Sequence, residues 1–167
     1  MSRIRVVLAD DHTVLREGLA ALLGDQPDID VVAEASDGAG AVRSALAQGP
    51  DVVLMDISMP GMDGIEATRR VRSELPEAQV LALTMHDEEA FFFHMLQAGA
   101  AGYLLKGASS EELIEAIHVV HSGGIYLNPA MARRLMDDYL HRVPAEQSEL
   151  DLLTPREREV LTLLADG

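Results

Sequence analysis

The chain has 167 residues, of which 48% are hydrophobic and 25% are charged, a composition typical of a globular domain with a short appendage. It contains no cysteine, which excludes disulfides, zinc–thiolate sites and thiol nucleophiles. The formal net charge of −15 disfavours a nucleic-acid-binding surface on this chain and favours association with cations. Because no apolar run reaches membrane-spanning length and the N-terminus lacks a signal-peptide core, we expect a cytoplasmic protein that does not bind membranes.

Short apolar segments alternate with amphipathic segments up to residue 124. The apolar segments predict strands at 4–9, 29–33, 52–55, 79–83 and 101–105. Helical spacing of apolar residues predicts helices at 14–23, 37–48, 65–75, 88–97 and 110–120. Ser36 and Ser109 are suitable capping residues for two of these helices. Strands and helices in alternation are typical of an α/β fold with a parallel sheet covered by helices on both faces.

The sequence after residue 124 indicates a linker. Asn128-Pro129 places a capping residue before a proline at the first helical position, which predicts a polar helix to about residue 141. Polar residues and a proline then follow over 142–152 and are typical of a linker.

A new helix is predicted to begin at Thr154-Pro155, where a capping residue again precedes a proline. Its apolar stripe has no further helix in the sequence to cover it, and consists of Val160, Leu161 and Leu164. We therefore expect a first domain at 1–124, a linker with one helix at 125–152, and the truncated start of a second domain at 153–167.

Polar residues stand at the carboxyl ends of four predicted strands. They are Asp10 and Asp11 after the first strand, Asp56 after the third, Thr84 after the fourth and Lys106 after the fifth. Because these ends share one edge of a parallel sheet, we expect the five side chains to converge. Three carboxylates together raise one another's pKa, and Mg²⁺ would remove that cost. Asp56 is then suited to act as a nucleophile toward phosphorus, with Lys106 and Thr84 stabilising the phosphoryl oxygens.

Each of these residues taken alone has an ordinary explanation. Asp10-Asp11 before a helix could complement its dipole, Thr84 could be a satisfied strand end, and Lys106 a solvated loop residue. Lys106, however, is the one lysine among thirteen basic residues. A site that requires a compact point charge would retain lysine where arginine does not fit.

Several motifs resemble the receiver domain of two-component response regulators. They are Asp10-Asp11, Asp56 with Met59-Pro60-Gly61-Met62-Asp63-Gly64, Thr84, and Gly102-Tyr103-Leu104-Leu105-Lys106. The resemblance covers 3–124 and implies a flavodoxin-like (CheY-like) doubly wound sheet of order 2-1-3-4-5. It implies that a sensor histidine kinase phosphorylates Asp56, and that Asp11, Asp56 and the backbone carbonyl of Ser58 bind Mg²⁺, with Asp10 acting through water.

The resemblance also implies a switch formed by Thr84 and Tyr103. In this family the hydroxyl moves toward the phosphoryl group while the aromatic ring turns inward. Such a protein is a signalling module that catalyses only its own phosphorylation and dephosphorylation, and is not a turnover enzyme.

Residues 153–161 resemble the opening helix of the helix-turn-helix domain in NarL/FixJ-type (LuxR-type) regulators. The resemblance implies transcription regulation through that DNA-binding domain. Its recognition helix lies beyond residue 167, so this polypeptide is not expected to read DNA by itself. We expect a piece of a longer protein, with a naturally short protein as the alternative.

Phosphorylation is expected to promote a homodimer, for which two surfaces compete. The NarL/FixJ group uses its first and fifth helices, and an outward stripe on the latter comprises Ile114, His118 and His121. The other surface is marked by Phe93, which is predicted to face solvent while Phe92 is buried. The family favours the first surface.

Two other functions remain as alternatives. A phosphatase with an aspartate nucleophile fits poorly, because such enzymes place the nucleophile after the first strand with a second aspartate two residues on. A stand-alone receiver that relays phosphate or sequesters a partner is disfavoured by the helix after Pro155. Two local questions also stay open: whether His86 tunes hydrolysis of the acyl phosphate, and whether the Lys106–Gly107 peptide is cis.

Overall fold

The computed structural model describes residues 2–85, 89–142, 156 and 160. Most of the segments predicted as linker and second domain, at 142–152 and 153–167, therefore lie outside the described residues, as does His86. Within the described part, no helix is long and apolar enough to span a membrane.

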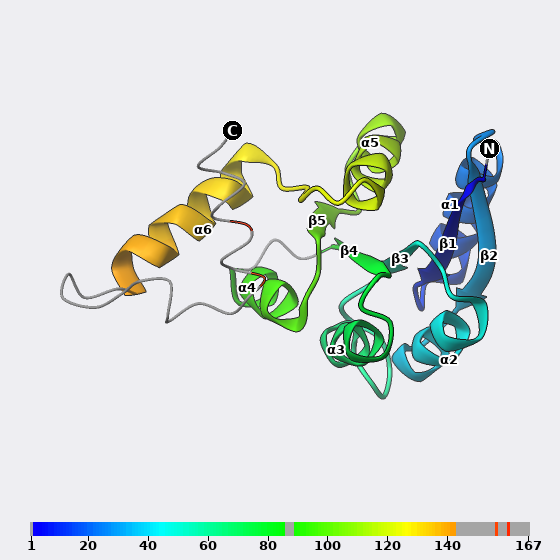
Figure 1. Cartoon of the computed structure of the whole chain (residues 1–167), viewed down its shortest axis with the longest axis horizontal. Helices are drawn as coiled ribbons and strands as arrows, with labels where there is room; N and C mark the ends of the chain where they lie inside the picture. The colour runs from blue at the N-terminus through cyan, green and yellow to red at the C-terminus, as the bar shows by residue number, and fades with distance from the viewer. Residues whose placement is uncertain (1, 86–88, 143–155, 157–159, 161–167) are drawn as a thin grey trace.

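A five-stranded parallel sheet forms the centre of the molecule (Figure 1). Its strands are β1 Ile4–Ala9, β2 Ile29–Ala35, β3 Val52–Met55, β4 Gln79–Thr84 and β5 Gly102–Leu105. The spatial order is β2-β1-β3-β4-β5, and every neighbouring pair is parallel. The expected fold class is confirmed.

Helices cover both faces of the sheet. They are α1 Thr13–Gly24, α2 Gly38–Gln48, α3 Gly64–Glu74, α4 Glu89–Ala98, α5 Ser110–His121 and α6 Pro129–Arg142. Alternate residues of the strands point to opposite faces and build two separate cores. One core packs against α2, α3 and α4, and the other against α1 and α5. All four residues of β3 are fully buried, as expected for the central strand.

The element boundaries agree with the sequence to within one residue except at the end of β2 and the start of α2. β2 continues to Ala35, so Ser36 does not cap the helix that follows. Instead the Asp37 carboxylate accepts a hydrogen bond from the backbone N–H of Gly40. The predicted caps at Ser109 and Asn128 are confirmed, since each accepts a backbone hydrogen bond from the residue three positions on.

The prediction that Phe93 faces solvent is wrong. Its side chain is only 9% exposed and packs beside Phe92, with ring centroids 5.0 Å apart. α6 packs against α4 and contributes Met131 and Leu135, both buried, to the same core. The helix expected to be polar is therefore amphipathic, and it covers the side of α4 that the sequence left open.

The segment between α5 and α6 extends the sheet at its β5 edge. Tyr126 accepts a hydrogen bond from Tyr103 N–H and donates one to the Ala101 carbonyl, at 3.2 and 3.0 Å. These bonds satisfy backbone groups that an edge strand would otherwise expose.

Two described residues of the predicted second domain contact the first domain. Val160 is fully buried and belongs to the same core as residues of α4 and α6, so the expectation that nothing covers its apolar stripe is wrong at this position. Leu161 and Leu164 lie outside the described residues. The Arg156 guanidinium donates hydrogen bonds to the Gln79 side chain and the Gly99 carbonyl.

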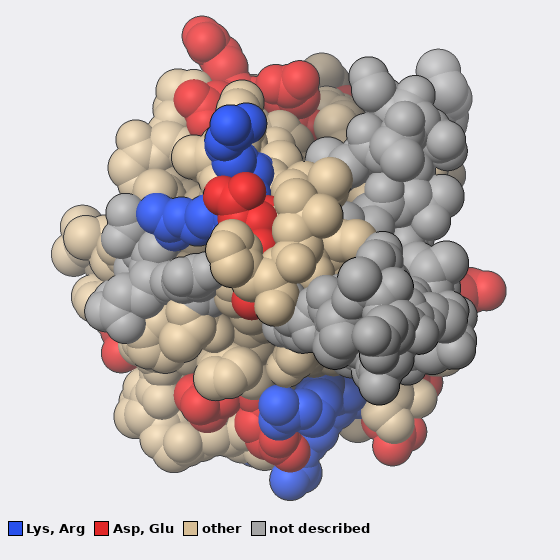
Figure 2. Space-filling view, turned by 90° about the vertical axis from the view of Figure 1, so that its left-hand side faces the viewer, with Lys and Arg blue, Asp and Glu red and all other residues tan. Residues whose placement is uncertain are grey.

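The surface on the side of α6 carries small groups of basic side chains intermixed with acidic ones (Figure 2). The described residues on this face form no broad basic area of the kind that binds nucleic acids. This agrees with the net charge of −15.

If α6 belongs to the receiver core, then Leu135→Ala should lower the free energy of unfolding by about 2–4 kcal/mol, because it leaves a cavity. Leu140→Ala on the same helix is the matched control, since Leu140 is 67% exposed and should change stability by less than about 0.5 kcal/mol. Urea unfolding measures both. Equal effects of the two substitutions would contradict the observed packing.

Candidate functional site

The polar residues predicted at the strand ends do converge at one edge of the sheet. Asp10, Asp56 and Lys106 each follow a strand directly. Their backbone N–H groups bond the carbonyls of Ala35, Ala9 and Thr84 on neighbouring strands, at 3.0, 3.0 and 2.8 Å. The hydrogen-bond ladder of the sheet thus continues one residue past the strands and fixes the position of each charged side chain.

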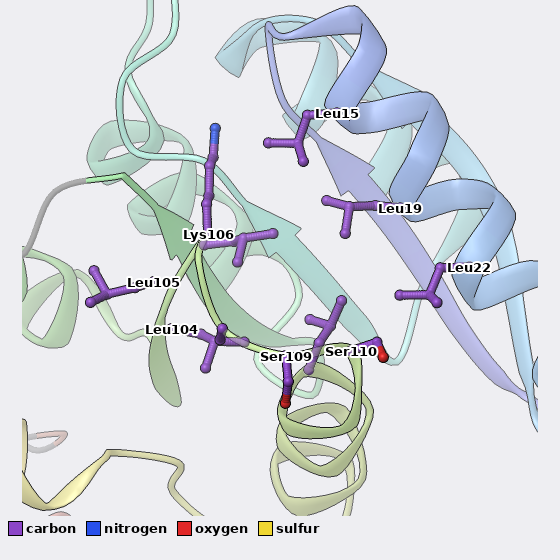
Figure 3. Close-up of a pocket in the computed structure, with 11 residues that line it drawn as sticks. Leu15, Leu19, Leu22, Leu104, Leu105, Lys106, Ser109 and Ser110 are labelled. Carbon is purple, nitrogen blue, oxygen red and sulfur yellow. The ribbon is translucent and has the colours of Figure 1, made fainter.

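Lys106 lies between the two buried carboxylates. Its Nζ is 2.8 Å from Asp10 Oδ2 and 3.2 Å from Asp56 Oδ2, and its side chain is 2% exposed. Figure 3 shows the stem running beside Leu15, with the nitrogen pointing away from Leu104 and Leu105. The lysine therefore buries its apolar stem while its ammonium group reaches the acids.

The two buried acids differ in their electrostatics. Burial raises the pKa of Asp56 to about 6, the Lys106 charge opposes this rise, and the Asp10 charge adds to it. Burial would also raise the pKa of Asp10, but hydrogen bonds from Lys106 and from the backbone N–H of His12 lower it below its ordinary value. Asp10 therefore stays ionised, whereas burial and the neighbouring negative charge disfavour the ionisation of Asp56.

The arrangement suits a divalent cation. Asp10, Asp11 and Asp56 supply carboxylate oxygens, and Lys106 balances only one of the three negative charges. The Oδ2 atoms of Asp10 and Asp56 are both buried, and they share the one ammonium group of Lys106. Oxygen donors with uncompensated charge are the ligands that Mg²⁺ prefers, so the residues present fit this ion. Ser58 lies exposed in the loop after Asp56, and the role of its carbonyl stays a prediction.

The loop between Asp56 and α3 ends at Gly64, which lies very close to the backbone of Asp56. Gly64 donates a backbone hydrogen bond to the Ile57 carbonyl at 2.8 Å. A methyl group on Gly64 would overlap the backbone oxygen of Asp56. The end of the loop therefore lies against the backbone of Asp56, and only a residue without a side chain fits at position 64.

The expected switch residues lie on adjacent strands and are both buried. Thr84 ends β4 and is fully buried. Tyr103 on β5 is 1% exposed, and its ring meets Phe92 edge to face at a centroid distance of 5.4 Å. The Tyr103 ring therefore points inward in this structure; the movement of either residue stays a prediction. No peptide bond among the described residues is cis, so the Lys106–Gly107 bond is trans.

His12 belongs to the site although the sequence did not assign it a role there. Its Nδ1 lies 3.0 Å from Asp10 Oδ1, 3.2 Å from Asp11 Oδ1 and 3.9 Å from Asp56 Oδ2. The same nitrogen is 3.2 Å from Lys106 Nζ. Its place directly after Asp10-Asp11 at a strand end was the signal that could have revealed it.

Comparison with known proteins gives consistent matches. The family described as "Response regulator receiver domain" matches residues 6–118. The transcriptional regulatory protein DegU of Brevibacillus brevis is 40% identical over 180 residues, covering 99% of this chain and 76% of DegU. The receiver domain of the response regulator NarL from Mycobacterium tuberculosis is 44% identical with a TM-score of 0.71, covering 74% of this chain and 99% of that one. A LuxR-family two-component response regulator from Aurantimonas sp. SI85-9A1 is 38% identical with a TM-score of 0.77, covering 83% and 99%.

In metal-free buffer at about pH 8, Asp56→Asn should be more stable than the wild type. A raised pKa means that the folded protein holds the Asp56 proton more tightly than the unfolded chain, so ionisation above about pH 6 costs stability. For a pKa that rises from 3.8 to about 6, this cost is on the order of 2–3 kcal/mol, and asparagine removes it.

The advantage of Asp56→Asn should shrink as the pH falls through about 6, because the wild-type carboxyl then becomes protonated. Urea unfolding at about pH 5 and about pH 8 measures it, with Asp30→Asn on the exposed face of β2 as the control. An equal advantage at both pH values, or none at the higher one, would contradict the assignment.

Proposed function

Since the chain belongs to the response regulator receiver family, we propose that it is the phosphorylation-controlled part of a two-component transcription regulator, with Asp56 as phosphoacceptor. The observation that carries this proposal is the contact of the single lysine ammonium with the buried Asp10 and Asp56 carboxylates. This pattern gives one nucleophile, one fixed positive charge and carboxylate oxygens suited to a divalent cation at the same strand ends.

The proposed reaction is phosphoryl transfer from a phosphohistidine of a sensor kinase. A carboxylate oxygen of Asp56 forms a bond to phosphorus while the phosphorus–nitrogen bond breaks, and the histidine nitrogen keeps the electron pair and takes up a proton. Lys106 stays beside the acceptor and stabilises the transferred phosphoryl oxygens, and the Thr84 hydroxyl donates a hydrogen bond to them. Mg²⁺ bound by Asp11, Asp56 and the Ser58 carbonyl, with Asp10 acting through water, would neutralise charge on the transferring group. The protein acts on itself and is not a turnover enzyme.

The output of the switch is proposed to run through α4 to the linker helix. Tyr103 contacts Phe92, and Phe92 contacts Phe93. These rings share one core with Met131 and Leu135 of α6. A change at Thr84 and Tyr103 therefore has a continuous packed route to the helix that precedes the DNA-binding domain of longer family members.

Labelling with acetyl phosphate in the presence of Mg²⁺ tests the proposed function. The wild type should incorporate one phosphoryl group, Asp56→Asn none, and EDTA should abolish incorporation into the wild type. Asp30→Asn, which changes an exposed aspartate of β2, should be labelled like the wild type. Persistent labelling of Asp56→Asn would refute the assignment of the phosphoacceptor.

Phosphorylation is further proposed to promote a homodimer through α1 and α5. The side of α4 near Phe93 is covered by α6, which leaves it unsuited to a partner. On the other face, Leu15, Leu19 and Leu22 of α1 point across a small cavity toward the start of α5 (Figure 3). His118 and His121 lie exposed on α5 beside the half-buried Ile114.

Sedimentation of the phosphorylated protein should show a dimer that is lost in Ile114→Arg and weakened in His121→Glu, because both place charge on the proposed surface. Leu46→Arg, at a half-exposed position of α2, is the control and should remain dimeric. Equal dimerisation of all variants would exclude this surface, and a monomer in every phosphorylated sample would exclude the dimer for this chain.

A further inference from the structure

We propose that His12 is a metal-ligating side chain of the Asp10–Asp11–Asp56 site, and that it extends the preference of this site from Mg²⁺ toward divalent ions that favour imidazole, such as Ni²⁺. The inference rests on the proposed metal-dependent function and specifies the ions that this site accepts. It makes His12 a determinant of metal specificity.

The positions of the four side chains match neighbouring ligands of one ion. Octahedral coordination with bonds of about 2.1 Å places adjacent ligand atoms about 3.0 Å apart and opposite ones about 4.2 Å apart. His12 Nδ1 lies 3.0 and 3.2 Å from Asp10 Oδ1 and Asp11 Oδ1, and 3.9 Å from Asp56 Oδ2. One ligand atom from each of the four residues lies within 4.8 Å of all the others. These separations are those of atoms around a common centre.

The backbone holds the ring of His12 at the site. His12 is the extended residue directly before α1, and its backbone N–H donates to Asp10 Oδ1 at 2.8 Å. The side chain is 58% exposed, so it reaches the carboxylates from the solvent side while Lys106 reaches them from within. The ring thus stands where an entering ion would meet the site.

His12 Nδ1 lies between a hydrogen-bond donor and two acceptors, and it cannot satisfy both kinds of neighbour. The Lys106 ammonium can only donate, whereas the ionised Asp10 and Asp11 carboxylates can only accept. A single ring nitrogen cannot accept from the former and donate to the latter at once. A cation between Nδ1 and the carboxylates satisfies the nitrogen lone pair and the acids together. The buried Oδ2 atoms of Asp10 and Asp56 share a single ammonium group between two carboxylates, and this uncompensated charge points independently to a further cation in this pocket.

The chemistry of imidazole decides which ions gain affinity. Carboxylate, carbonyl and water oxygens suit Mg²⁺, while imidazole suits first-row transition metals, whose affinity rises toward Ni²⁺ and Cu²⁺. A nitrogen ligand should therefore strengthen Ni²⁺ binding strongly and Mg²⁺ binding little.

Calorimetric titration of the full chain with Mg²⁺ and, separately, with Ni²⁺ tests the proposal. In His12→Asn the dissociation constant for Ni²⁺ should rise roughly tenfold or more, while that for Mg²⁺ should change less than about twofold. His94→Asn, at an exposed histidine of α4, is the matched control and should leave both constants unchanged. Mg²⁺ should compete with the Ni²⁺ that His12 helps to hold, and Asp11→Ala should weaken both ions.

The possible failures can be told apart. Equal Ni²⁺ affinity in His12→Asn and the wild type would overturn the ligand role of His12 and leave the proposed function intact. Equal loss of both ions would also overturn it, since His12 would then only position the aspartates. If the wild type bound neither ion, the metal site of the proposed function would fail together with this inference.

Discussion

The contact of the Lys106 ammonium with Asp10 and Asp56 is the interaction on which the site depends. Two carboxylates buried side by side repel each other and lose hydration, and a paired cation offsets both costs. Lysine suits this place because its narrow stem passes between apolar side chains and ends in a compact charge. Lys106 does not neutralise the negative charge of the site completely. Asp11 adds a third carboxylate, and the pKa of Asp56 stays raised to about 6. This residual negative charge makes the site receptive to a cation.

The sequence predicted the convergence of the site well, since it follows from one rule. Strands in a parallel sheet end at a common edge, so residues far apart in the chain meet once the strands are located. Asp10, Asp56, Thr84 and Lys106 could be placed in this way. The order of the strands does not follow from that rule, and here it came from the family resemblance. His12 escaped notice because it follows the strand end by three positions, and only the turn into α1 brings its ring back over the carboxylates.

The predictions of solvent exposure failed for side chains that are buried by a distant segment of the chain. The apolar periodicity of a helix does not determine where such a segment lies. Three consecutive phenylalanines on α4 cannot all face the sheet, and helical periodicity assigned Phe93 to solvent. Phe93 instead lies in one core with Met131 and Leu135 of α6, which come more than thirty positions later in the chain. Val160 was misjudged for the same reason, because its partner is the preceding domain and not a later helix. Periodicity shows which face of a helix is apolar, but it does not show what covers that face.

The packing of α6 on α4 has a consequence for how a signal can leave the site. Phe92 and Phe93 lie between Tyr103 and α6, so any displacement of the Tyr103 ring must be accommodated in the core that the linker helix shares. Close-packed cores transmit such strain because they contain little free volume. The same packing buries the Phe93 side of α4, whereas the leucines of α1 face a cavity beside α5. The proposed intramolecular coupling and the proposed self-association therefore use opposite faces of the sheet, so that a substitution on one face should impair one without abolishing the other.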